Sequence, residues 1–149
     1  WVGSYKPRML ALTGEVGDGW LPTVEYLPRG AASLPEHNAR IDDAAHAAGR
    51  SPSDVRRLLN IMRVGLSPVP RGLLDGPVEQ WIDQLATLAL DDGISAFLIG
   101  GDDPAMTERF GAEIAPAVRE LVAQERKLQG APTTITSTPN VRPRDPVTN

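Results

Sequence analysis

Four short apolar runs, each followed by a segment with helical spacing of apolar residues, restrict the fold of this chain more than any other feature. The runs are Trp1–Val2, Gly19–Leu21, Leu58–Val64 and Ala96–Ile99. Short apolar strands separated by helices indicate an α/β fold with parallel pairing and covered sheet faces. Four such βα units fill about half of the roughly 250 residues of an eight-unit barrel. A small open doubly wound sheet remains the alternative, because periodicity alone does not separate the two folds.

Several residues mark where helices begin and break. Ser33 with Glu36 three residues later matches the capping box that opens a helix. Asp103–Pro104 is an acidic cap followed by proline at the first helical position. Within that last helix we expect Pro116 to cause a kink or to split the helix in two. The segment 65–76 is rich in proline and glycine and is predicted to be a loop.

The two ends of the chain differ in composition from its middle. From Gln129 onward threonine, proline and asparagine dominate, and apolar residues almost disappear. Such a segment buries too little apolar surface to offset the entropy cost of ordering it. The sequence therefore predicts a folded domain over residues 1–128 and a disordered tail, or a linker to a fused domain, over residues 129–149. Trp1–Val2 forms a strand pattern without a lead-in, which favours a chain truncated at its N-terminus.

Composition excludes several classes of function. The net charge of -4 leaves no basic surface for nucleic acid. With no cysteine and two histidines, neither a thiolate metal site nor a histidine-rich one is expected. His37 and His46 fall on different faces of one predicted helix and are expected at the surface. No apolar run approaches the roughly 20 residues of a membrane span, and without a leader the expected location is cytoplasmic.

Three segments carry a resemblance to a known family: WVGSYKPRMLALTGEVGDGWLP, RIDDAAHAAGRSPSDVRRLLN and AFLIGGDDPAMTERFGAEIAPAVREL. In their order and spacing they resemble the C-terminal half of luciferase-like monooxygenases, including the deazaflavin-dependent members, over residues 1 to about 127. The resemblance implies the bacterial luciferase-like (β/α)8 TIM barrel, of which these four βα units would supply strands five to eight. The pattern departs from the family at Lys6, where a glycine usually stands.

The resemblance also implies an activity. The intact protein would be a flavin-dependent oxidoreductase that uses FMN or coenzyme F-420 on a small organic substrate, as a monooxygenase or as a dehydrogenase. The chain alone would be inactive. No acid–base pair or nucleophile stands out, which fits an enzyme whose cofactor performs the reaction. The alternative is a non-catalytic half-barrel that dimerises or binds a partner, and the oligomeric state, including a homodimer, stays open.

The loop after the first apolar run is the candidate cofactor site. It combines a glycine, a hydroxyl group, two basic side chains and a helix that starts at Pro7. Free N–H groups at a helix N-terminus and nearby positive charge attract anions. On the residues alone, a plain turn with two solvated basic side chains is the simpler interpretation. The resemblance makes the anion the phosphate of FMN or coenzyme F-420, and the candidate binding residues are Gly3, Ser4, Tyr5, Lys6 and Arg8.

Other loops offer a rival phosphate site and a substrate pocket. The loop Gly100–Asp103 also joins a strand to a helix, but its two carboxylates would repel a phosphate, so we expect it to cap the helix. The candidate substrate-pocket residues are Trp20, Tyr26 and Arg63. Tyr26 and its neighbour Glu25 follow the second strand on the catalytic side of such a barrel, although a plain surface loop is the commoner outcome. Arg63, near the end of a buried strand, needs a carboxylate partner or an anionic ligand.

Overall fold

The computed structural model describes residues 1–130 and shows strands and helices in alternation. The helices are α1 (Pro7–Val16), α2 (Leu34–Ala47), α3 (Val78–Leu90), α4 (Pro104–Arg109) and α5 (Ala115–Gly130). The strands are β1 (Gly19–Trp20), β2 (Arg56–Ile61), β3 (Gly65–Leu66), β4 (Asp75–Gly76) and β5 (Ala96–Ile99). Short 3-10 turns are η1 (Val24–Tyr26), η2 (Gly30–Ser33) and η3 (Pro52–Asp54), and η4 (Phe110–Ile114) is a π-helical turn.

The strands of the main sheet follow one another in space as they do in sequence. β1, β2 and β5 pair in that order, and both pairings are parallel. Val2 adds a parallel bridge to Trp20 on the free side of β1. The strand order does not reverse around the first strand, as it would in a doubly wound sheet. The predicted parallel order is therefore confirmed for β1, β2 and β5, whereas the predicted first strand, Trp1–Val2, is only a single bridge at Val2.

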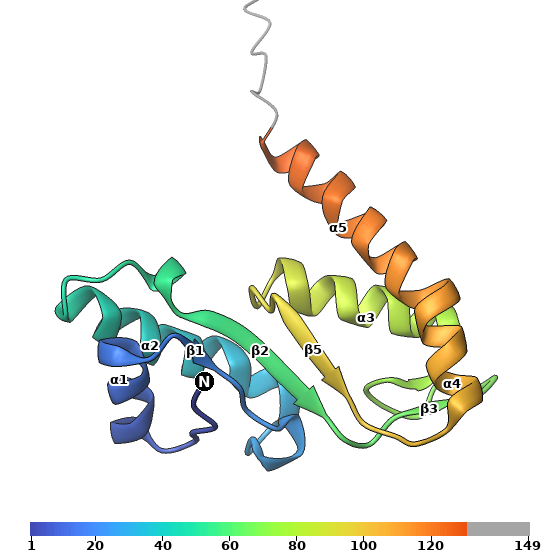
Figure 1. Ribbon diagram of the computed structural model, residues 1–149, viewed down its shortest axis with the longest axis horizontal. Helices are drawn as coiled ribbons and strands as arrows, with labels where there is room; N and C mark the ends of the chain where they lie inside the picture. Colours follow the sequence, from blue (N-terminus) through green and yellow to red (C-terminus); the bar gives the residue numbers. More distant parts are fainter. Residues whose placement is uncertain (131–149) are drawn as a thin grey trace, which may run out of the picture.

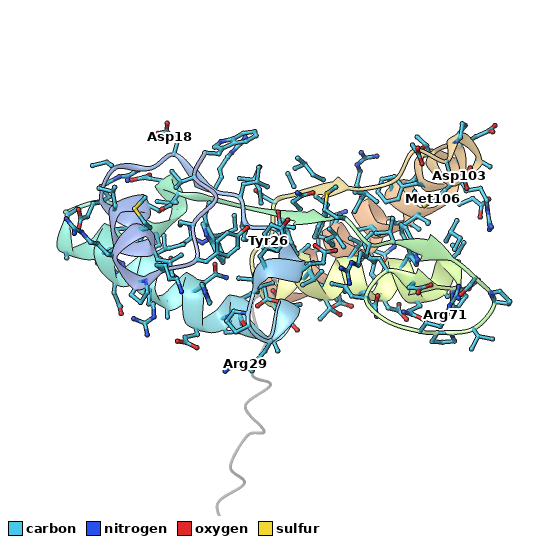
Figure 2. The ribbon with its side chains drawn as sticks, turned by 90° about the horizontal axis from the view of Figure 1, so that it is seen from below. Asp18, Tyr26, Arg29, Arg71, Asp103 and Met106 are labelled. Carbon is cyan, nitrogen blue, oxygen red and sulfur yellow. The ribbon has the colours of Figure 1, made fainter. Side chains whose placement is uncertain are left out.

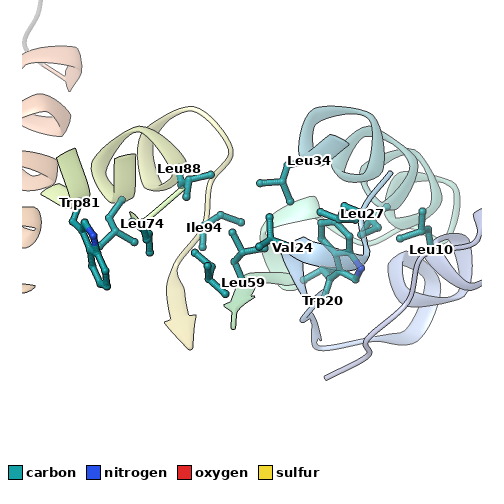
Figure 3. Packing of buried hydrophobic residues seen from close by; sticks show 14 of the residues in the cluster. Leu10, Trp20, Val24, Leu27, Leu34, Leu59, Leu74, Trp81, Leu88 and Ile94 are labelled. Atoms are coloured by element: carbon teal, nitrogen blue, oxygen red, sulfur yellow. The ribbon is translucent and has the colours of Figure 1, made fainter. Parts of the chain in front are cut away.

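The main sheet carries helices along one face. Figures 1 and 2 show α2 and α3 lying on the same side of β2 and β5. On that side the buried side chains form one core, which contains Trp20, Leu59 and Trp81. Figure 3 shows Trp20 near Leu10, Leu27 and Leu34, Trp81 beside Leu74, and Leu59 between the two groups. The core therefore runs continuously from α1 and α2 across the sheet to α3.

The segment 65–76 is more regular than predicted. β3 and β4 pair in parallel as a small separate sheet, with Gly65 opposite Asp75 and Leu66 opposite Gly76. Leu74 anchors the segment because its side chain is fully buried, with 0% exposure. Its backbone has a φ of 50°, a left-handed conformation that is costly for a residue other than glycine. The Leu74 N–H donates to Gln84 Oε1 on α3 at 2.8 Å, which holds this turn against the helix.

The start of α2 differs from the predicted capping box. Ser33 is the last residue of η2 and has helical dihedral angles, so its side chain makes no cap bond to α2. Its hydroxyl instead accepts the backbone N–H of Arg29 at 3.1 Å. The prediction was wrong because a 3-10 turn runs directly into the helix and leaves no extended cap residue. The other end agrees with the sequence, since Gly49 adopts a φ of 73° directly after the helix.

The last helical stretch breaks near the predicted proline. Asp103 caps α4 by accepting the Ala105 N–H at 2.9 Å, as predicted. The π-helical turn Phe110–Ile114 then separates α4 from α5, and Pro116 lies in the first turn of α5. A proline lacks the N–H that an uninterrupted α-helix needs, and a wider turn before it accommodates this loss. Because α5 extends through Gly130, the described structure continues past the predicted boundary at residue 128; residues 131–149 of the predicted tail lie outside it.

Candidate functional site

The loops that follow the parallel strands meet along one edge of the sheet. Thr23, after β1, forms a parallel bridge with Asn60 near the end of β2. Gly100, after β5, packs so closely on Met62 that an added Cβ would lie 2.6 Å from the Met62 carbonyl oxygen. Ligands of parallel α/β proteins usually bind at this carboxyl edge, and the loops that the sequence analysis singles out lie along it.

The candidate cofactor loop is held by its own side chains. The Ser4 side chain was expected to face the anion, but Ser4 is 4% exposed and its Oγ lies 3.3 Å from Thr13 Oγ1. The Ser4 carbonyl accepts the indole N–H of Trp20 at 2.9 Å. The Tyr5 hydroxyl accepts the Thr23 N–H at 2.9 Å. These bonds fix the backbone between Val2 and α1 and leave its N–H groups as the available donors.

The backbone donors of this loop are free for a ligand. Within the described residues, none of the N–H groups of residues 3 to 6 donates to a backbone carbonyl. Met9 and Leu10 donate back to the Lys6 carbonyl, each at 3.0 Å. Lys6 and Arg8 are exposed, and neither takes part in an ion pair within residues 1–130. Unpaired N–H groups beside two free cations suit an anion.

A pocket of about 220 Å³ opens beside this loop, between the first turns of α1 and α2. Its charged side chains are Lys6, Arg29, Arg40 and Glu36. Glu36 lies 3.6 Å from Arg29 and 3.3 Å from Arg40, and these side chains are about half exposed. Three cations face a single carboxylate, so the pocket is positively charged. Figure 2 shows Arg29 at the outer surface of this region.

His37 also lines this pocket and corrects a prediction. The sequence placed it at the surface, but only 7% of it is exposed. Its ring stacks on Trp20, with centroids 5.7 Å apart and planes 11° apart. Its Nδ1 lies 2.8 Å from the Ser33 carbonyl oxygen. The helical pattern missed this because α1 and the loop after β1 cover a face of α2 that sequence reasoning left open. His46 is exposed, as predicted.

The three candidate substrate residues have different surroundings. Trp20 is fully buried, with 0% exposure, under α2. Tyr26 is 72% exposed and meets Tyr5 edge to face, with ring centroids 6.1 Å apart. Arg63 lies beyond the strand, which ends at Ile61 rather than at the predicted Val64, and its side chain is exposed. Tyr26 and Arg63 thus lie on the surface at the carboxyl edge, and Trp20 lies beneath it.

Glu25 explains why β2 ends early. One carboxylate oxygen, Oε1, accepts the N–H groups of both Met62 and Arg63, at 2.9 and 2.8 Å. These two donors are thereby withdrawn from pairing within the sheet. Sequence reasoning considered Glu25 only as a loop residue beside the substrate, because no local pattern indicates a partner 37 residues away.

An ion pair between a buried arginine and a partly exposed aspartate, at the opposite edge of the sheet, was missed by sequence reasoning. Arg57, near the start of β2, is 7% exposed and donates to Asp42 and to Asn38 Oδ1 on α2. Burial lowers the pKa of Arg57, and the charge and hydrogen bond of Asp42 oppose that shift. Nearby, burial and the charge of Asp91 raise the pKa of Asp92. These residues lie at the amino ends of the strands, where side chains usually stabilise the fold rather than take part in catalysis.

Two kinds of feature are absent from the described part of the chain. Over residues 1–130 no three of the side chains that commonly bind metals gather into a potential site. In the same residues no helix has the length and apolar character needed to cross a membrane.

Comparison with known proteins identifies a similar fold but no related sequence. By sequence, no protein-family model and no curated protein matches the chain. By structure, the chain is similar to an F420-dependent secondary alcohol dehydrogenase, solved in complex with an F420-acetone adduct, at a TM-score of 0.63 and 15% sequence identity. The match covers 78% of this chain and 48% of that one. The chain thus shares its fold with about half of that dehydrogenase.

Proposed function

We propose that the chain is the C-terminal part of a deazaflavin-dependent oxidoreductase, four βα units of an eight-unit barrel. The observation that carries this proposal is the parallel sheet in chain order, which matches about half the length of an F420-dependent dehydrogenase. Four βα units, each a strand followed by a helix, make half of such a barrel. The proposed cofactor is coenzyme F-420 rather than FMN, since the similar structure carries an F420 adduct.

In this proposal the loop of residues 3–8 holds the cofactor phosphate. The backbone N–H groups of Gly3, Ser4 and Tyr5 donate to its oxygens, and Lys6 and Arg8 supply the charge. The Ser4 hydroxyl stays on Thr13, and Ser4 acts through its backbone. Trp20 acts indirectly, because its indole N–H holds the Ser4 carbonyl. Lys6, which stands where the family usually has a glycine, adds a positive charge beside the phosphate.

The proposed substrate pocket lies at the same carboxyl edge of the main sheet. When bound, the deazaflavin ring would supply hydride transfer, and this chain would supply position and electrostatics. Tyr26 and Arg63 are exposed at the carboxyl edge and are proposed to line the substrate pocket. The first four units would complete the pocket, so the isolated chain is proposed to be inactive.

Cofactor titration of the full-length protein tests this proposal. We expect coenzyme F-420 to bind more tightly than FMN, and Lys6→Ala or Arg8→Ala to weaken binding about tenfold to a hundredfold, since a hydrogen bond to a charged group contributes roughly 1.5–3 kcal/mol. Lys127→Ala, on the exposed surface of α5, is the matched control and should leave affinity unchanged. If neither Lys6→Ala nor Arg8→Ala changes affinity, the phosphate site is elsewhere. If neither cofactor binds, the non-catalytic interaction module is favoured.

A further inference from the structure

We propose that an anion entering the pocket between α1 and α2 binds together with a proton, which His37 takes up on Nε2. The proposal rests on the anion site at residues 3–8 and adds a pH dependence and a further ligand from α2. The pocket of about 220 Å³ is lined by groups from both helices and from the loop before η2. The anion is a phosphate ester group without a hydroxyl hydrogen, or a group of like size such as sulfate.

The hydrogen bond of Nδ1 determines the state of the ring. A carbonyl oxygen only accepts, so Nδ1, 2.8 Å from the Ser33 oxygen, carries a hydrogen. In the neutral ring Nε2 is then an acceptor without a hydrogen. No group within residues 1–130 forms a hydrogen bond with Nε2, although His37 is only 7% exposed. His37 thus lines a positively charged pocket with one ring nitrogen that has no hydrogen-bond partner among the described residues.

An anion has only acceptor atoms to offer this nitrogen. Nε2 can donate to it only after gaining a proton, and the imidazolium so formed also attracts the anion by its charge. Each binding event therefore favours the other by the same free energy. Stacking on Trp20, with the ring planes 11° apart, places an aromatic face against the imidazolium, which stabilises the cation.

Other ionisable groups line the same pocket, and their effects on anion binding must be distinguished from the effect of His37. Lys6 comes from the start of α1, Tyr5 and Arg29 from loops, and Glu36 and Arg40 from α2. Glu36 alone is negative, and it pairs with Arg29 and Arg40. The negative charge of Glu36 opposes anion binding. Removing its charge with Glu36→Gln should raise anion affinity about fivefold or more while leaving the dependence on His37 intact.

The test is a sulfate titration of the 149-residue chain between pH 5.5 and 8.5, because sulfate keeps its charge across this range. Affinity should be highest at low pH and fall by up to about tenfold per pH unit as His37 loses its proton. Calorimetry in two buffers of different ionisation enthalpy should show uptake of up to one proton per sulfate at neutral pH. His37→Gln should remove both effects, and His46→Gln, an exposed histidine on the same helix, should change neither.

A second measurement needs no variant. The chain has two histidines, so its imidazole NMR signals report His37 and His46 separately. Sulfate should move the titration midpoint of His37 to higher pH and leave that of His46 in place. Sulfate binding without proton uptake, or with an unshifted His37 signal, overturns this inference and leaves the proposed cofactor loop standing. Absence of sulfate binding at every pH overturns the inference as well, whereas the proposed function stands or falls on cofactor titration of the full-length protein.

Discussion

The region of α1, β1 and α2 is packed far more closely than the region of β5, α4 and α5. In α2 the side chains of Leu34, Ile41 and Ala45 have 0% exposure. In β5 and α4, by contrast, no residue is buried, and a hollow of about 450 Å³ lies between α3, β5 and α5. Figure 1 shows α5 leading away from the sheet rather than lying along it. The first region fills its part of the common core closely, while the second leaves more of its apolar surface exposed.

The largest expected difference between the two regions concerns side-chain truncation. Trp20→Ala should lower the free energy of unfolding by about 3–5 kcal/mol, because it removes a fully buried indole and leaves a cavity. Leu98→Ala on β5, which is 42% exposed, should change it by less than about 0.5 kcal/mol. Urea unfolding of both variants checks this. A cost of about 2 kcal/mol or more for Leu98→Ala would mean that β5 is covered in solution, and the contrast would not hold.

Two helical glycines provide a matched pair. At Gly14 an added Cβ would lie 2.3 Å from the Ile41 carbonyl oxygen on α2, whereas at Gly111 it would meet nothing within 4 Å. Gly14→Ala should therefore destabilise the protein by about 2–3 kcal/mol through overpacking. Gly111→Ala should be neutral or stabilise it by about 0.5–1 kcal/mol, because alanine restricts the unfolded chain. Thermal unfolding distinguishes the two, and equal shifts would show that α1 and α2 are not in close contact.

Two ion pairs sharpen the comparison further. Asp42→Asn leaves the buried Arg57 without its carboxylate and should destabilise the protein by about 2 kcal/mol. Glu113→Gln removes the partner of Arg109 on the surface near α4, where both side chains are about half exposed. Its effect on stability should lie within experimental error. Chemical unfolding at low and at high salt measures both, and strong salt dependence of the Asp42→Asn effect would contradict a buried pair.

The smallest expected effect is a pH dependence at Asp92, between α3 and β5. Burial and the charge of Asp91 raise its pKa in the folded state, so ionised Asp92 destabilises the fold. The penalty is complete above the folded-state pKa and vanishes below the unfolded-state value near 3.8. Asp92→Asn should therefore raise stability at pH 7 by about 0.3–0.5 kcal/mol and have no effect near pH 3. Asp83→Asn, on the exposed face of α3, is the control, and an equal gain there would point to net charge rather than to burial.

The order of strands and helices was predictable, because each element has its own period and its own end signals. The strand–helix alternation, the Asp103 cap and the break near Pro116 all rest on residues within one turn of each other. The start of α2 was not predictable, since Ser33 has the cap pattern but follows directly from a 3-10 turn. Local chemistry indicates where an element can begin, and the preceding segment decides whether it does.

The candidate site was predictable only as a loop. The charges of Lys6 and Arg8 and the helix start at Pro7 are visible in sequence, and the structure leaves the loop's donors unpaired. The burial of the Ser4 hydroxyl depends on Thr13, nearly two turns into α1 and on its covered side. His37 becomes part of the pocket only because Trp20 from another element lies against it. Contacts between distant segments have no local pattern, and they determine which of the suggested groups face a ligand.

The order of strands in the main sheet has a consequence for synthesis on the ribosome. Each strand of the main sheet pairs with the strand of that sheet made before it, since β2 joins β1 and β5 joins β2. A chain emerging at about 5–20 residues per second can therefore complete each pairing without waiting for a distant later segment. The closely packed α1 and α2 emerge before β5 and give it an edge that has already formed. Stalled nascent chains in which residue 61 has just left the ribosomal exit tunnel should already protect α1 and α2 from proteolysis.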